Sequence, residues 1–217
     1  MPPRRSKPRT KDPLVELEQT GPRPLYVLDG EERTLLEEFL TALKDAAVPP
    51  AARDFNFEAF VGKEATITRI LDSAATLPAF AQRRMIVVTQ ADKLFTESEA
   101  LMRYLEQPSP TTVLVFIAEK FDGRTKVYKA AQKAGAAFRF ARPKPSEMPA
   151  LVKQRAERRG VKIEPAAVRM LIDAVGADLG AADRSLELLD LYRGDDGRAI
   201  DADDVSTVIF AAKEESV

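Results

Sequence analysis

Short apolar runs that alternate with helical stripes are the feature of this sequence that most restricts its fold. Several runs rich in Val, Ile, Leu and Phe have the length of buried strands: residues 25–28, 54–60, 85–88, 113–117 and 137–140. Between them, apolar residues recur at helical spacing in residues 35–43, 67–74, 101–105 and 126–134. Strands that alternate with helices in this way indicate a parallel sheet with helices on both faces.

The ends of these elements carry recognisable start and stop signals. Asp29–Gly30 suits a turn after the first strand, and Pro49–Pro50 ends the first helix. Thr96 and Glu99 have the spacing of a capping box, and Gly135 is placed to end the helix before the fifth strand. In the second predicted strand, alternate residues share one face: Phe55, Phe57 and Ala59.

The strand pattern disappears after a proline-rich break that begins near residue 142. Helical stripes follow in residues 148–156, 168–175 and 179–189, and Asp201 is placed to cap a last helix. We therefore expect an all-α domain after the α/β domain. The predicted segments are a disordered basic arm, residues 1–23, an α/β domain, residues 24–142, and a helical domain, residues 143–217.

The first eleven residues are basic, contain no acid and are interrupted by proline. Their cations are Arg4, Arg5, Lys7, Arg9 and Lys11. These cations could contact nucleic-acid phosphates. A solubilising tail with no partner explains them equally well.

Composition excludes several kinds of chemistry. The chain has no Cys and no His, which rules out disulfides, thiolate nucleophiles, imidazole bases and the usual zinc sites. No apolar run is long enough to span a membrane, and no secretory signal is recognisable. We therefore expect a cytoplasmic protein with no membrane partner, no metal and no cofactor.

A strand-first α/β domain followed by helices is also the layout of ATPases that carry a lid. A P-loop needs two glycines followed by Lys and Ser or Thr, so that amides and the ammonium surround phosphate. Residues 29–34 contain one glycine, no lysine and the acids Glu31 and Glu32, which would repel a triphosphate. Thr89 and Gln90 follow the third strand, where carboxylates for Mg²⁺ would stand. We expect no catalysis; a divergent ATPase with an atypical phosphate loop is the alternative.

Two charged clusters have an ordinary explanation. The acid pairs at residues 195–196 and 203–204 are predicted to be solvated. A third function, nucleic-acid binding by the helical domain, would use a basic stripe, for which a solvated helix face is the commoner explanation. The stripe comprises Arg155, Arg158, Arg159 and Lys162.

The chain from residue 25 to residue 209 resembles the delta subunit of bacterial DNA polymerase III. The order and spacing of several blocks carry the resemblance: residues 25–32, 76–88, 105–108, 113–116, 158–163 and 201–205. The resemblance implies an AAA+-like fold without a functional P-loop, a helical lid domain and a C-terminal helical collar. The chain stops at Val217, about where the linker to the collar would begin, so we expect a fragment or a truncated form.

In function, the resemblance implies a clamp-loader subunit of the DNA polymerase III holoenzyme, associated with the nucleoid during replication. Such a subunit binds the sliding clamp and opens its ring for loading onto DNA, without hydrolysing ATP. The implied partners are the clamp, the ATPase and delta prime subunits of the loader, and primer-template DNA within the complex. Because the collar holds the subunit in the loader, clamp contact is expected more firmly than loader assembly.

The clamp-binding element of the family falls on the segment between the second helix and the third strand. The matching residues are Leu77, Pro78, Ala79 and Phe80. Phe80 matches the aromatic of a hydrophobic pair, and Ala79 stands where the family often has a larger apolar residue, so Leu77 would compensate. Connections of this kind usually run over the surface, where an exposed Leu and Phe form a contact. From the residues alone, burial of Leu77 or Phe80 in the core is the favoured interpretation, and the resemblance reverses it for Phe80.

Overall fold

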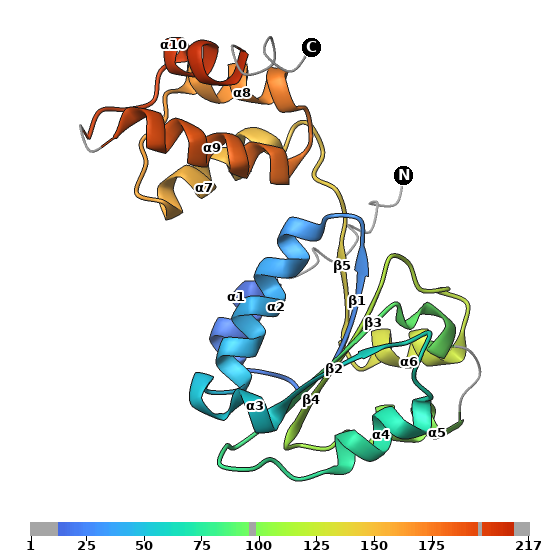
Figure 1. Ribbon diagram of the computed structural model, residues 1–217. Helices are drawn as coiled ribbons and strands as arrows, with labels where there is room; N and C mark the ends of the chain where they lie inside the picture. The colour runs from blue at the N-terminus through green and yellow to red at the C-terminus, as the bar shows by residue number, and fades with distance from the viewer. Residues whose placement is uncertain (1–12, 96–98, 195–196, 211–217) are drawn as a thin grey trace. The chain divides into compact units, whose positions relative to one another are not determined.

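The protein is described by a computed structural model that covers residues 13–95, 99–194 and 197–210. The chain divides into two compact units, Met1–Phe140 and Ala141–Val217 (Figure 1). The arm cations between Arg4 and Lys11, the cap at Thr96 and the acid pair 195–196 lie outside the described residues.

Parallel strands form a single sheet in the first unit, in the order β2-β3-β4-β1-β5. The strands are β1 (Leu25–Gly30), β2 (Phe57–Val61), β3 (Arg84–Thr89), β4 (Thr112–Ala118) and β5 (Ala137–Phe140). The central strands β1, β3 and β4 are buried along almost their whole length. This burial is typical of a sheet that is covered on both faces, and it confirms the predicted parallel sheet.

Helices cover both faces of this sheet (Figure 1). They are α1 (Pro13–Thr20), α2 (Arg33–Ala47), α3 (Arg53–Asn56), α4 (Ile67–Ala75), α5 (Glu99–Glu106) and α6 (Lys126–Lys133). On one face, Phe39 of α2 packs against the rings of Tyr26 and Phe138. On the other face, Ile70 of α4 and Val127 of α6 join the second apolar cluster. The predicted helices on two faces are thus confirmed.

The prediction of a disordered arm over residues 1–23 is wrong for residues 13–20. They form helix α1, which lies beside α2 in Figure 1. Pro13 stands at the first helical position, where its missing N–H costs nothing. Leu17 is buried in the core on that face of the sheet, with Leu14 packed beside it. Burial of Leu17 and partial burial of Leu14 outweigh the polar composition of the segment.

The predicted second strand, residues 54–60, is wrong for residues 54–56, which are helical. Pro50–Ala52 forms a 3₁₀ turn, α3 follows directly, and β2 begins only at Phe57. The side chain of Asn56 donates to the carbonyl of Ala52 at 2.8 Å, which favours the helical turn over an extended strand. Phe55 and Phe57 therefore do not share the face of a strand.

The second unit is formed by helices, as predicted. They are α7 (Met148–Arg158), α8 (Pro165–Val175), α9 (Leu179–Arg193) and α10 (Ala202–Val205), followed by a π-helical turn at Ser206–Phe210. Apolar residues of the predicted stripes meet in its interior: Met148, Val152, Ala156, Leu171, Leu179, Leu186 and Leu189 are buried. Among the described residues, no helix combines the length and apolarity that crossing a membrane requires.

Two charged groups of the second unit differ from the prediction. Arg155 is buried and donates to Asp183, so it does not join Arg158 and Lys162 in an exposed basic stripe. Of the pair 203–204, Asp203 is exposed as predicted, whereas Asp204 is buried and accepts hydrogen bonds from Arg198 at 2.5 and 2.7 Å. Asp201 caps α10 as predicted and forms a capping box with Asp204. The burial of Arg155 and the burial of Asp204 are each compensated by a side chain of opposite charge.

Candidate functional site

The loop between α4 and β3 carries the predicted contact residues at the surface of the first unit. The side chain of Phe80 is 92% exposed and that of Leu77 is 75% exposed. Pro78 and Ala79, between them, are partly buried. Neither Leu77 nor Phe80 therefore belongs to the hydrophobic core, contrary to the interpretation that the residues alone favour.

A buried amide holds this loop in place. Asn56, the last residue of α3, has no exposed surface. Its Oδ1 accepts the N–H of Ala79 at 2.8 Å, and its Nδ2 donates to the carbonyl of Ala79 at 2.6 Å. Both backbone groups of Ala79 are thus paired with one side chain, in the manner of a strand partner. The loop has a fixed attachment one residue before Phe80.

Phe80 itself has an unusual backbone conformation. Its φ is +58°, in the left-handed region that large side chains rarely adopt. Such conformations persist only where surrounding contacts enforce them, and they are concentrated at functional sites. The hydrogen bonds of Ala79 provide that constraint and direct the Phe80 ring into solvent.

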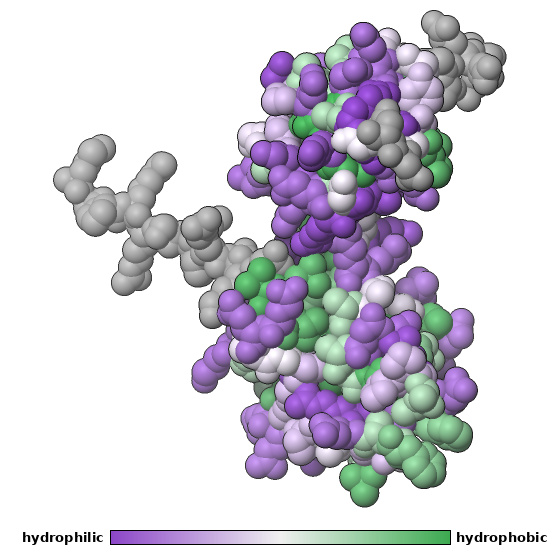
Figure 2. All heavy atoms as spheres, turned by 90° about the vertical axis from the view of Figure 1, so that its left-hand side faces the viewer, coloured by the Kyte–Doolittle hydropathy of each residue, from purple (hydrophilic) through white to green (hydrophobic). Residues whose placement is uncertain are grey.

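Phe55 is a surface residue that the sequence analysis did not assign to this site. Its ring meets that of Phe80 edge to face, with centroids 6.1 Å apart and an interplanar angle of 71°. The side chain of Phe55 is 65% exposed. We call Phe55, Leu77 and Phe80 the apolar knob. Hydrophobic side chains gather at the lower edge of the first unit in Figure 2, where Figure 1 places α3 and the loop after α4.

The prediction missed Phe55 because it assigned this residue to a strand. The signal that could have found it is local. Pro50 starts a short turn, and Asn56 is a residue that readily bonds to nearby backbone. Together they favour a helical turn before β2, which would leave Phe55 on the outer side.

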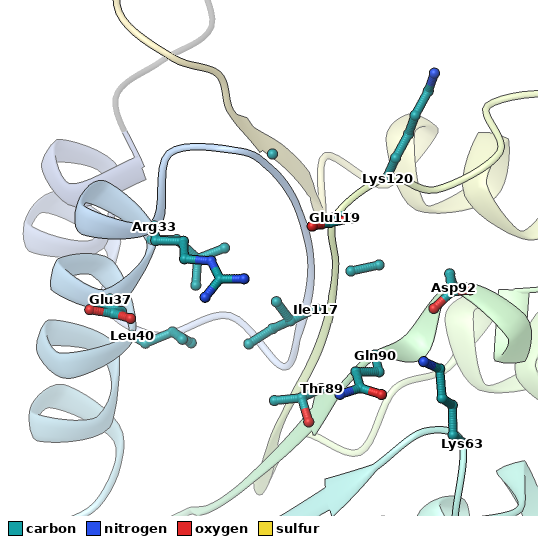
Figure 3. Close-up of a pocket in the computed structure, with 13 residues that line it drawn as sticks. Arg33, Glu37, Leu40, Lys63, Thr89, Gln90, Asp92, Ile117, Glu119 and Lys120 are labelled. Atoms are coloured by element: carbon teal, nitrogen blue, oxygen red, sulfur yellow. The ribbon is translucent and has the colours of Figure 1, made fainter. Parts of the chain in front are cut away.

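A second candidate site lies at the carboxyl ends of β1, β3 and β4. It is a cleft of about 850 Å³. The cleft is lined by the cations Arg33, Lys63 and Lys120 and by the carboxylates Glu37, Asp92 and Glu119. In Figure 3, Arg33 and Glu37 extend from α2, and Lys120 points away from the cavity. With Lys120 turned away, the cations of the lining do not outnumber its acids, so the cleft has no preference for a polyanion.

The corner between β1 and α2 is bonded to neighbouring strands. The N–H of Gly30 donates to the carbonyl of Glu119 at 3.1 Å, and the N–H of Glu32 donates to that of Phe140 at 3.1 Å. The carboxylate of Glu32 accepts the N–H of Thr34 at 3.2 Å and caps α2. In a phosphate-binding loop, such amides face the ligand. Here they are paired within the protein, and a carboxylate occupies the start of the helix.

Asp29, the acid at the end of β1, is held by contacts inside the protein. It is buried, and burial raises the pKa of its carboxyl. Its Oδ2 accepts the N–H of Phe121 at 3.5 Å and the hydroxyl of Tyr128 at 3.4 Å. Burial also raises the pKa of Tyr128. Asp29 therefore ties the end of β1 to α6 and does not line the cleft.

The groups that follow β3 are uncharged, as the sequence indicates. Thr89 and Gln90 line the cleft and are exposed. The nearest acid along the chain is Asp92, in the next turn. Within the described ranges, no group of three or more acidic side chains is arranged to hold a metal ion.

Comparison with known proteins adds a separate line of evidence. The family described as DNA polymerase III, delta subunit, matches residues 26–140. The DNA polymerase III subunit delta of Bacillus subtilis (strain 168) is 26% identical over 205 residues, which cover 89% of this chain and 59% of that protein. The chain thus spans about three fifths of this curated relative.

Solved structures give a consistent picture. The Bacillus subtilis DNA clamp loader delta protein is similar with a TM-score of 0.74 and 25% identity, over 93% of this chain and 62% of that one. The Thermotoga maritima RuvB Holliday junction branch migration motor is similar with a TM-score of 0.53 and 15% identity, over 93% of this chain and 66% of that one. The second likeness shows the fold alone. Together they confirm the AAA+-like α/β fold with following helices.

Proposed function

The chain belongs to the DNA polymerase III delta subunit family, and from that premise we propose that it binds the sliding clamp and opens its ring for loading onto DNA. The chain would act as a binding protein and leave ATP hydrolysis to partner subunits. The clamp-binding element of the proposal comprises Leu77, Pro78, Ala79 and Phe80.

The observation that carries this proposal is the exposure of Phe80 on an anchored loop. A phenylalanine that is 92% exposed leaves almost its whole apolar surface in water. Burying such a ring in a pocket of a partner contributes about 2 kcal/mol or more. Because the loop is already held by Asn56, little conformational freedom remains to be lost on binding. An exposed ring on a fixed support is typical of a protein contact.

Ring opening requires only that this contact discriminates between two states of the clamp. A ligand shifts a conformational equilibrium by the difference between its affinities for the two states. We propose that the knob binds the open clamp more tightly than the closed clamp. No bond is made or broken in the protein by such a mechanism.

The corner after β1 supports the absence of ATP hydrolysis. Its amides are bonded to Glu119 and Phe140, and the Glu32 carboxylate stands at the start of α2. The alternative, a divergent ATPase, is favoured by the position of the cleft at the carboxyl ends of the strands, where α/β folds bind ligands. Calorimetry with Mg-ATP separates the two proposals. We expect no heat of binding, and micromolar affinity would favour the ATPase.

The further partners of the proposal are the ATPase and delta prime subunits of the loader and primer-template DNA within the complex. The chain spans only about three fifths of the length of its relatives. We therefore propose these partners from family membership and not from a site in the structure. The two proposed units of the chain are an AAA+-like domain, residues 24–142, and a lid domain, residues 143–217.

The decisive experiment measures binding of the chain to the sliding clamp of its own organism by surface plasmon resonance. Phe80→Ala should weaken binding by about tenfold or more, with an unchanged unfolding transition, because the ring is outside the core. Tyr192→Ala is the control, since Tyr192 is an exposed aromatic of the second unit. Unchanged affinity in the Phe80 variant would contradict the proposal.

A further inference from the structure

We infer that Phe55 is a second clamp-contact residue and that Asn56 is the positioning residue that sets the Phe55 and Phe80 rings in one fixed arrangement. The inference rests on the proposed function and extends it beyond residues 77–80. It adds two residues from α3, an element that precedes the loop by more than twenty positions in the sequence.

The first argument is the exposure of both rings despite their contact. Their centroids are 6.1 Å apart, yet Phe55 remains 65% exposed and Phe80 remains 92% exposed. The edge-to-face contact orients the rings without burying either one. Two adjacent aromatic side chains that present apolar area to water fit a partner with one apolar pocket wide enough for both.

The neighbouring aromatic, Phe57, shows a different arrangement. Its side chain is only 37% exposed, and the ammonium of Lys44 lies 5.4 Å from its ring centroid. The cation thus covers the Phe57 ring from within the protein. In α3 itself, Arg53 is paired with Asp45 of α2. This leaves Phe55 as the apolar group that α3 offers to a partner.

The second argument is the position of the buried amide between the two rings. Asn56 follows Phe55 directly, and Ala79 precedes Phe80 directly. The two hydrogen bonds between Asn56 and Ala79 therefore join the backbones that carry the rings. A further bond from Asn56 to the carbonyl of Ala52 fixes the turn of α3. The ring pair is organised before binding, which lowers the entropy that a complex must lose.

Clamp affinity of single and double variants tests the role of Phe55. We expect Phe55→Ala to weaken binding by about fivefold and Phe80→Ala by about tenfold or more. Because the two rings would enter one pocket, the double variant should lose less than the product of the two single losses. Thermal unfolding should be unchanged in Phe55→Ala, and Tyr192→Ala serves as the control for an exposed aromatic.

The possible outcomes separate this inference from the proposed function. Affinity in Phe55→Ala within about twofold of the parent, with Phe80→Ala impaired, overturns the role of Phe55 and leaves the proposed function intact. Unchanged affinity in Phe80→Ala overturns the proposed function itself.

The positioning role of Asn56 has its own readout. We expect the coupling between Phe55 and Phe80, measured by the same double-variant cycle, to disappear when Asn56→Ala is present. Asn56→Ser, a small polar residue whose single hydroxyl cannot pair with both backbone groups of Ala79, provides a second variant should Asn56→Ala fail to fold. Coupling that persists in a folded Asn56 variant would show that Asn56 only stabilises the fold and would overturn its positioning role.

Discussion

Gly30 in β1 lies directly against the backbone of Phe140 in β5. A Cβ atom added at Gly30 would be 1.9 Å from the carbonyl oxygen of Phe140, and Gly30 has a φ of +137°. The two residues are also register partners of the parallel pair β1–β5. Because of this close approach, the backbone after β1 packs directly on β5. Related folds bind phosphate at the corresponding corner.

Gly30→Ala is therefore expected to destabilise the protein by about 3 kcal/mol or more, since strand backbone cannot yield as a flexible side chain can. Urea denaturation of the full chain, followed by circular dichroism, measures the loss. Gly160→Ala is the matched control. Gly160 also has a positive φ and ends α7 with the hydrogen bonds of a left-handed cap, but nothing lies within 4 Å of its added Cβ. We expect this control to cost about 1 kcal/mol, and equal losses would contradict the close contact with Phe140.

Replacing Phe80 by two different small residues tests its backbone conformation. At a φ of +58°, alanine keeps the unfavourable contact of Cβ with the backbone, whereas glycine removes it. We expect Phe80→Gly to be more stable than Phe80→Ala by about 1 kcal/mol in urea denaturation. If the Phe80→Ala variant is as stable as the Phe80→Gly variant, or more stable, residue 80 does not have a left-handed backbone conformation.

Truncation of Asn56 should destabilise the first unit more than an exposed substitution does. Asn56→Ala removes three hydrogen bonds and leaves the N–H and carbonyl of Ala79 without their protein partner. We expect a loss of about 2–3 kcal/mol in the free energy of unfolding. Hydrogen exchange provides the local measurement, because the N–H of Ala79 should lose its protection. Retained protection of that amide would contradict the contact.

Much of the fold follows from local patterns. Strands such as residues 85–88 and 113–117 are continuous and β-branched, so their burial is evident without knowledge of their neighbours. The order β2-β3-β4-β1-β5 is not evident in the same way, because it depends on which strands each crossover joins. Family resemblance, rather than periodicity, indicated the AAA+-like arrangement.

The errors arise where tertiary contacts outweigh local preference. Residues 54–60 alternate like a strand, but the bonds from Asn56 to Ala52 and Ala79 stabilise a turn instead. Leu17 lies in a polar, proline-containing segment, and only its burial among the leucines and aromatics around α2 makes α1 stable. The apolar knob could be located only in part, since Phe55 and Phe80 are brought together by a contact between distant segments.

The ion pair between the partly exposed Arg198 and the buried Asp204 in the second unit predicts a specific acid sensitivity. Hydrogen bonds from Arg198, assisted by the N–H of Asp201, hold the pKa of the Asp204 carboxyl below its ordinary value of 3.8. A carboxyl whose pKa is lower in the folded state contributes stability above its unfolded pKa and loses it as the pH falls through the folded pKa. The contribution should therefore be complete at neutral pH and should decline below about pH 4.

Asp204→Asn removes this contribution, and Asp203→Asn is the matched control, because Asp203 is the exposed acid next to it in α10. We expect Asp204→Asn to lower the free energy of unfolding by about 1 kcal/mol at neutral pH. Its difference from the parent should shrink as the pH falls below about 4. Thermal unfolding of the full chain across this pH range measures both effects. A difference that stays constant down to acidic pH would show that the Arg198–Asp204 pair does not control the titration.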